Sequence, residues 1–290
     1  MTGVQTCALP ILSLRRKSWP LVELMKNKFI PNSIACLFGL FCAFLVSAQA
    51  ATPKKVLVVT VTKGFRHSSI PTAEKILGEL GQKSGAFTVE YVRNDQEMAE
   101  KMTSTALKQY DGFIFANTTG ILPLPDKEAF LSEIKSGKAF IGMHSASDTF
   151  RGQDAIDPYI EMLGGEFRTH GDQAGVECLV ADVNHPATKH LKRDKLQSYC
   201  IEQEEMYLFK NFDASKVHQL FYLDKHPNNK QEAGRFSVAW CKNYAQGRVF
   251  YTSLGHREDV WENKRYQAHI LGGIKWALGL EEGDASPGNI

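Results

Sequence analysis

Two patterns of apolar residues alternate along the first half of the chain. Short apolar runs, typical of strands buried on both faces, lie at 55–61, 112–116 and 139–143, and residues 87–92 are interpreted as a further strand. Helices are expected between them: Ser69 can cap the first, a polar stretch ending at Leu107 forms the second, and Pro125–Ile134 forms the third. This rhythm predicts parallel βαβ units, and hence an α/β fold with a doubly wound, mostly parallel sheet and helices on both faces.

The second half of the chain has a less regular pattern. Short strands are expected at 176–181, 217–223, 236–240 and 248–251. A last helix then carries Tyr266, Ile270, Ile274 and Ala277 on one face and ends at Gly279. Residues 281–290 are interpreted as a polar tail without a core pattern.

The first 50 residues are organised differently. Residues 25–50 have the layout of a secretory signal peptide, with a basic start, an apolar run of 13 residues at Ile34–Val46 and the cleavage signal Ala48-Gln49-Ala50. A membrane-spanning helix needs about 20 residues, so no stable membrane insertion is expected. We expect cleavage after Ala50 and export to the periplasm or the medium. Residues 1–24 are interpreted as a non-native translated leader.

The charge balance changes once this segment is set aside. Of the 34 Lys and Arg residues five lie in the first 50 positions, and of the 32 Asp and Glu residues one does. The remaining 240 residues therefore carry 29 basic and 31 acidic side chains, a net charge of −2. This balance argues against a nucleic-acid partner. The length suits one large α/β domain or two small ones.

Cysteine and glycine patterns exclude several kinds of site. Only Cys178, Cys200 and Cys241 remain after cleavage, and no C-x-x-C pair exists, which excludes zinc-finger and thioredoxin-type sites. We interpret the three as buried structural cysteines. Neither G-x-x-x-x-G-K-[ST] nor G-x-G-x-x-G occurs, so no nucleotide cofactor is expected.

Polar residues follow the predicted strands at the ends where doubly wound sheets bind ligands. The sharpest pattern is Gly142-Met143-His144-Ser145-Ala146, the shape of a strand-to-helix elbow that would project His144 into a cleft. An ordinary turn with a surface histidine fits this short motif equally well. His67 follows the first strand, and His256 follows the late strand at 248–251. Three histidines at three strand ends are expected to converge.

Other polar residues near these ends are candidates for binding a substrate. They are Ser145, Asn117, Thr118, Tyr207, Asp148 and His170. For Asp148 a role in capping the helix after the elbow competes with this interpretation.

Glu204 and Glu205 form an adjacent carboxylate pair. Neighbouring residues on a strand point to opposite faces, so at most one can enter the pocket, and a glycosidase with two carboxylates flanking one bond is not expected. That one can act as a metal ligand, a general base or an acceptor for a sugar hydroxyl.

Four stretches, taken in order, resemble the ThuA-like (trehalose utilisation) family. They are Thr62–Ile70, Phe140–Thr149, Glu204–Tyr207 and Gly247–His256. The resemblance places a ThuA-like domain at 51–280 and implies the flavodoxin-like fold of class I glutamine amidotransferases. It also implies His67, His144, Glu205 and His256 as site residues. Ser237 stands where the family suggests proline, and Glu204 where aspartate is usual.

Three functions compete on these observations. The family is linked to disaccharide and keto-sugar metabolism, so the first is a carbohydrate hydrolase, isomerase or lyase. Its three histidines, His67, His144 and His256, suit Zn²⁺ or a similar divalent ion. Without a metal, the same histidines could transfer protons.

The second function, glutamine amidotransferase activity, is disfavoured because His144 occupies the place of the nucleophile and Ser145 lies one residue away. The third is a non-catalytic sugar-binding protein, in which Tyr207, Trp240 and Trp261 would stack on sugar rings. Trp240 also suits a place in the core, since it ends an apolar strand.

Overall fold

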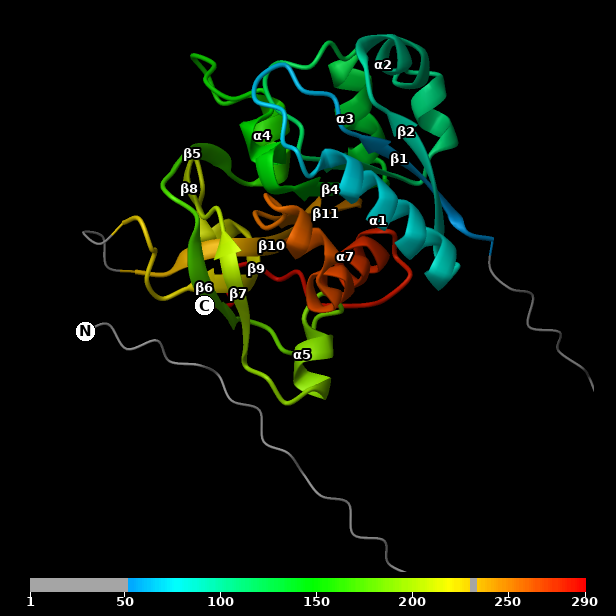
Figure 1. The fold of residues 1–290 in the computed structure, drawn as a ribbon. Coiled ribbons are helices and arrows are strands. Elements are labelled where there is room, and N and C mark those ends of the chain that lie inside the picture. Colours follow the sequence, from blue (N-terminus) through cyan, green and yellow to red (C-terminus); the bar gives the residue numbers. More distant parts are fainter. Residues whose placement is uncertain (1–51, 230–233) are drawn as a thin grey trace, which may run out of the picture. The chain divides into compact units, whose positions relative to one another are not determined.

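The computed structural model describes residues 52–229 and 234–290, so the expected leader and signal peptide lie outside the described residues. A nine-stranded sheet has the order β2-β1-β3-β4-β11-β10-β9-β6-β7, and β5 pairs separately with β8 (Figure 1). The predicted α/β class is confirmed. In the described ranges, no helix is both long and apolar enough to span a membrane.

One half of the sheet is parallel. Its strands are β2 (Phe87–Val92), β1 (Lys54–Val59), β3 (Gly112–Ala116), β4 (Ala139–Met143) and β11 (Gly247–Thr252). Their order is that of flavodoxin-like sheets, in which the winding reverses between the first and third strands and ligands bind at the carboxyl ends. The sequence pattern located all five. The central strands β1, β3 and β4 are easily found because they are buried on both faces and therefore apolar at nearly every position.

The other half is antiparallel. Its strands are β10 (Phe236–Tyr244), β9 (His218–Leu223), β6 (Ala174–Val180) and β7 (Ser198–Glu204). The pattern missed β7, and also β5 (Glu166–His170) and β8 (Tyr207–Lys210). In β7 buried and exposed residues are mixed, and most residues of β5 are exposed. Neither strand therefore contains the continuous apolar run by which the sequence pattern identifies a strand.

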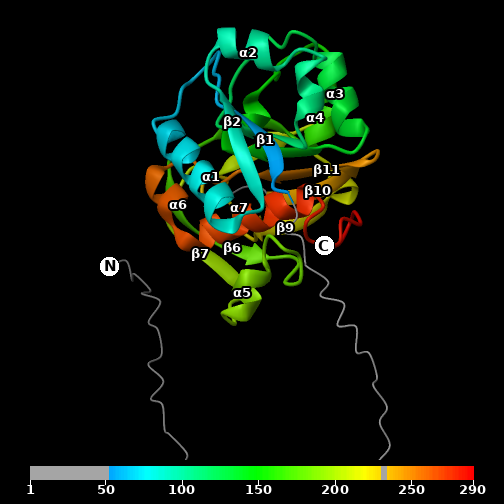
Figure 2. The same cartoon turned by 90° about the vertical axis from the view of Figure 1, so that its right-hand side faces the viewer.

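Helices cover both faces of the parallel half (Figures 1 and 2). On one side, α1 (Ile70–Ser84), α6 (Glu258–Glu262) and α7 (Lys264–Ala277) contact one another. On the other side lie α2 (Asp95–Lys101), α3 (Lys127–Lys135) and α4 (Pro158–Leu163). The short helix α5 (Lys189–Arg193) packs against α7. Three 3₁₀ turns lie at Ala106–Gln109, His144–Asp148 and Ala214–Lys216.

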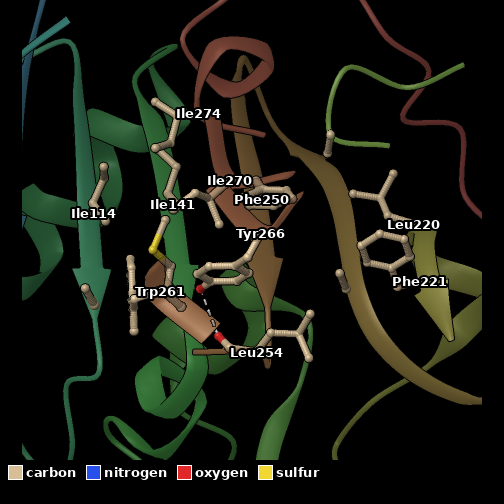
Figure 3. Packing of buried hydrophobic residues seen from close by; sticks show 14 of the residues in the cluster. Ile114, Ile141, Leu220, Phe221, Phe250, Leu254, Trp261, Tyr266, Ile270 and Ile274 are labelled. Carbon is tan, nitrogen blue, oxygen red and sulfur yellow. Dashed lines mark hydrogen bonds between the residues drawn. The ribbon is translucent and has the colours of Figure 1, made fainter. Parts of the chain in front are cut away.

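The core forms two layers separated by the sheet. Alternate residues of β1 divide between them: Val56 and Val58 face the α1 and α7 layer, and Leu57 and Val59 face the α3 and α4 layer. Figure 3 shows the first layer, where α7 side chains such as Ile270 and Ile274 pack beside residues of β3, β4 and β11. Burial on both faces holds the strand ends rigid, and these ends position the site.

Two expectations about local structure are wrong. Ser69 lies at the first position before α1, but its side chain does not cap the helix. Cys178 and Cys241 are buried, whereas Cys200 is exposed, because it lies on the solvent-facing side of β7 between the buried Tyr199 and Ile201. Residues 281–290 also contact the domain, since the Gly288 N–H donates to the Val217 carbonyl at 3.0 Å. Backbone hydrogen bonds of this kind leave no apolar pattern in the sequence.

Candidate functional site

Three histidines meet at the carboxyl ends of the parallel strands. His67 lies in the loop after β1, His144 directly follows β4, and His256 lies in the loop after β11. Their ring centroids are 4.7 Å apart for His67 and His144, 5.1 Å for His67 and His256, and 5.2 Å for His144 and His256. The predicted convergence of the three histidines is therefore confirmed.

The turn that carries His144 has the predicted shape of an elbow. His144 has a φ of 48°, a left-handed conformation that is strained for a residue with a side chain. A Cβ on Gly142 would lie 2.9 Å from Leu163 and 3.3 Å from the Cβ of Ala146. Small residues on either side of His144 are thus required by close packing. The strained turn is held by the surrounding core.

His144 does not project into an open cleft, as the elbow pattern suggested. Its side chain is fully buried. The His67 and His256 rings meet it edge-on, and the Tyr207 ring lies 4.5 Å away. These rings come from other loops and from β8, so only the tertiary arrangement could reveal that His144 lies beneath the pocket.

One hydrogen bond orients the His144 ring. Its Nδ1 lies 2.7 Å from the Ser253 carbonyl, which can only accept, so Nδ1 carries the proton. The lone pair of the neutral ring is therefore on Nε2. Nε2 lies 2.8 Å from the Tyr207 hydroxyl, 3.1 Å from Nε2 of His67 and 3.2 Å from Nδ1 of His256. Metal-binding histidines are commonly oriented by such a bond from the other ring nitrogen to a carbonyl.

Glu205 completes this group, called below the His/Glu cluster (His67, His144, Glu205 and His256). Its Oε2 lies 3.6 Å from His144 and 3.3 Å from His256, and its Oε1 lies 3.1 Å from Nδ1 of His170. Burial opposes the charge of Glu205, but the neighbouring imidazoles of His144 and His256 hold the pKa of the carboxyl below its usual range. Glu205 is therefore ionised near neutral pH.

The two more accessible histidines of the cluster differ in their protonation. Burial, and then the proximity of the His144 and His256 imidazoles, lower the pKa of His67 to about 3, so this ring is neutral. Burial also opposes protonation of His256, but the hydrogen bond to Glu205 outweighs it and raises the pKa of His256. The cluster thus pairs a carboxylate with one imidazole that accepts protons readily and one that does not.

The donor atoms of the His/Glu cluster fit a metal ion. All four lie within 4.8 Å of one another. Four of the six separations measure 3.1, 3.2, 3.3 and 3.6 Å. In a tetrahedral zinc site with ligands at about 2.0–2.1 Å, donor atoms are about 3.3–3.4 Å apart. Both the spacing and the nitrogen and oxygen chemistry therefore allow this group to hold a divalent ion.

A pocket of about 370 Å³ opens beside the cluster, a size within the range of about 300–1,000 Å³ for small-molecule sites. His67, Glu205 and His256 line it. The other lining residues are Gly64, Phe65, Thr119, Ser145, Asp148, Arg151, Phe167, His170 and Tyr207. Four of the residues predicted to contact a substrate therefore line the pocket: Ser145, Asp148, His170 and Tyr207.

Two predicted substrate-binding residues do not reach the pocket. Asn117 is fully buried with a φ of 54°, and its Nδ2 donates to Ser69 and to the Gly255 carbonyl at 3.2 and 3.0 Å. The Thr118 hydroxyl pairs with that of Thr149 at 2.7 Å. The prediction is wrong for both, because the left-handed turn directs these side chains inward. Asp148 does not cap a helix either; it forms an ion pair with Arg151.

Glu204 has a role that the sequence pattern did not reveal. As expected, only one of the two adjacent carboxylates enters the pocket: Glu205 lines it, whereas Glu204 is fully buried. The Glu204 carboxylate accepts the backbone N–H groups of Glu205, Gly255 and His256 at 2.8, 2.9 and 3.2 Å. Burial raises the pKa of Glu204 despite these bonds. Glu204 thus ties together the two segments that carry Glu205 and His256.

Of the three aromatic residues expected to stack on a sugar, only Tyr207 lines the pocket. Trp240 and Trp261 are fully buried, and their indole N–H groups donate to the carbonyls of Leu163 and Gly255, each at 2.8 Å. Stacking of these tryptophans on a sugar is therefore excluded. Phe65 and Phe167, which were not expected there, line the pocket beside Tyr207. Phe65 could have been found from the sequence, since it lies in the loop after the first strand, between polar residues.

Known proteins resemble this chain in sequence and structure. The ThuA family model, described as trehalose utilisation, matches residues 55–277. A ThuA-like protein from Bacteroides uniformis aligns with a TM-score of 0.62 at 18% identity, covering 80% of this chain and 94% of its own. One from Parabacteroides merdae gives a TM-score of 0.62 at 17% identity, covering 78% and 90%. At these identities the two structures support the fold alone. No curated protein matches the chain.

Proposed function

Because the chain belongs to the ThuA (trehalose utilisation) family, we propose that it is an enzyme of carbohydrate metabolism that acts on a disaccharide or a keto-sugar. The observation that carries this proposal is the meeting of three histidines and one carboxylate at the edge of a pocket of about 370 Å³. Perturbed ionisable groups in such a place are typical of a catalytic site.

The His/Glu cluster divides naturally into ligands and a base. His67, His144 and His256 would hold a divalent ion such as Zn²⁺, as three protein ligands do in catalytic zinc sites. Such an ion would supply the Lewis acidity that polarises a carbonyl or acidifies water. Glu205 is ionised and accepts a proton from the reacting hydroxyl or water, and His170 holds its second oxygen at 3.1 Å.

Glutamine amidotransferase chemistry is not supported by this site. That reaction needs a thiolate at the elbow, where this chain has His144. Among the described residues, none of the cysteines lines the pocket. Burial also raises the pKa of Cys178 and Cys241 well above the usual range of a thiol, which leaves them unreactive.

The test is to measure the metal content of the purified protein and its turnover of disaccharides and their 3-keto forms. We expect about one divalent ion per chain, loss of turnover on chelation, and recovery when Zn²⁺ is restored. Sugar binding without conversion, with or without the ion, would identify a non-catalytic binding protein. A chain that neither retains a metal nor converts any sugar would contradict the proposal.

We further propose that the protein is exported after cleavage at Ala50, although this segment lies outside the described residues. The support is the basic start, the short apolar run and the Ala48-Gln49-Ala50 signal. Intact-mass measurement of the protein from an expressing bacterium should give a chain that begins at Ala51. A mature protein that retains Met25 would disprove export by this route.

A further inference from the structure

Two phenylalanines give the pocket an aromatic surface beside its charged groups. We propose that Phe65 is a platform that stacks on the apolar C–H face of a sugar ring of the substrate, and that Phe167, whose ring lies under Arg151, completes the apolar lining of the pocket. This inference rests on the proposed function, and it assigns recognition of the sugar to residues outside the His/Glu cluster.

Phe65 is held in an exposed position at the pocket. It is 68% exposed, and its ring meets the His67 ring edge-on at 4.9 Å. The loop around it is anchored: the Thr119 hydroxyl donates to the Phe65 carbonyl at 2.9 Å and accepts the Gly64 N–H at 3.1 Å. A single exposed apolar residue is common on protein surfaces. An exposed phenylalanine on an anchored loop, next to a buried cluster of ionisable groups, is better explained by ligand binding.

Phe167 supplies the second ring from strand β5. It is half-buried, and its ring centroid lies 4.4 Å from that of Tyr207. The Arg151 guanidinium lies over the Phe167 ring, 5.2 Å from its centroid, and Arg151 also pairs with Asp148. This part of the wall therefore combines an aromatic ring with a charged pair that can donate and accept hydrogen bonds.

The combination matches the chemistry of a sugar ring. A pyranose presents C–H groups on its face and hydroxyl groups around its rim, so the exposed Phe65 ring can cover the face while Arg151 and Asp148 bind the rim. A wholly apolar ligand would remove water from these charged groups without replacing their hydrogen bonds, which is unfavourable. A carbohydrate is therefore the ligand class that this wall suits.

The test compares Phe65 variants on the sugar that the wild-type protein converts. Stacking of this kind is worth about 0.5–1.5 kcal/mol, so Phe65→Ala should raise KM about 2- to 13-fold. Phe65→Tyr retains the ring and should stay near the wild-type KM, and Phe65→Leu should resemble Phe65→Ala. The matched control is Ile121→Ala, because Ile121 is 61% exposed but does not line the pocket.

The same variants separate this inference from the proposed function. Each Phe65 variant should retain the metal content and the kcat of the wild type, because the platform does not touch the reacting atoms. An unchanged KM in Phe65→Ala would overturn the platform while the His/Glu cluster kept its role. Loss of metal in Phe65→Ala would also overturn it, since Phe65 would then support His67. Wild-type protein that converts no sugar would reject the proposed function itself.

Discussion

Replacement of His144 by glutamine is expected to abolish metal retention and to lower turnover by about 10²- to 10⁴-fold. The reason is geometric, because Nε2 of His144 lies within 3.1–3.6 Å of the donor atoms of His67, His256 and Glu205. Without this nitrogen, the remaining donor atoms of His67, His256 and Glu205 lack the ligand that lies near all of them, and they no longer form a complete set of metal ligands. Glutamine fills a similar volume, so the fold should persist.

Metal equivalents per chain, measured by elemental analysis beside a thermal unfolding curve, check this expectation. His190→Gln is the matched control: His190 is also a buried histidine, but neither of its ring nitrogens has a hydrogen-bond partner and it does not line the pocket beside the cluster. The control should retain both metal and turnover. A His144→Gln protein that is folded and still turns over substrate at the wild-type rate would exclude His144 from the reaction.

Glu204→Gln should weaken both the fold and the cluster without touching the pocket. The glutamine amide has one oxygen, so it can keep the bonds to the N–H groups of Glu205 and His256, but its NH₂ group then faces the N–H of Gly255. One unsatisfied buried donor costs roughly 1–3 kcal/mol in the free energy of unfolding. The Gly255-His256 turn should loosen, and metal affinity should fall about 10- to 100-fold, as when an outer partner of a metal ligand is lost.

Two readouts separate positioning from general destabilisation. Thermal unfolding measures the loss of stability, and the visible absorption spectrum of bound Co²⁺ reports the geometry of the ligands. Glu202→Gln is the matched control, since Glu202 lies on the same strand but is exposed to solvent. If Glu204→Gln lowered stability but left the Co²⁺ spectrum and affinity unchanged, Glu204 would be a structural residue only.

The sequence by itself determined the parallel half of the fold and the meeting of three histidines. Strands such as Gly112–Ala116 and Ala139–Met143 are apolar at nearly every position because both faces are buried, and this signal is local. Once the strands are known, the topology of a doubly wound sheet places residues that follow them at one edge. His67 and His144 could therefore be brought together before any coordinates were known.

Only the tertiary structure decided how the side chains around these histidines are arranged. The left-handed turn at Asn117 directs its amide inward to Gly255, 138 residues away in sequence. Trp240 is buried, whereas Phe65 remains exposed at the pocket. Glu204 binds the Gly255-His256 turn from a strand whose mixed polar pattern concealed it. Each outcome depends on contacts between distant segments, and neither hydrophobic periodicity nor spacing contains information about which side chains of these loops will turn inward or which residues of the antiparallel half they will meet.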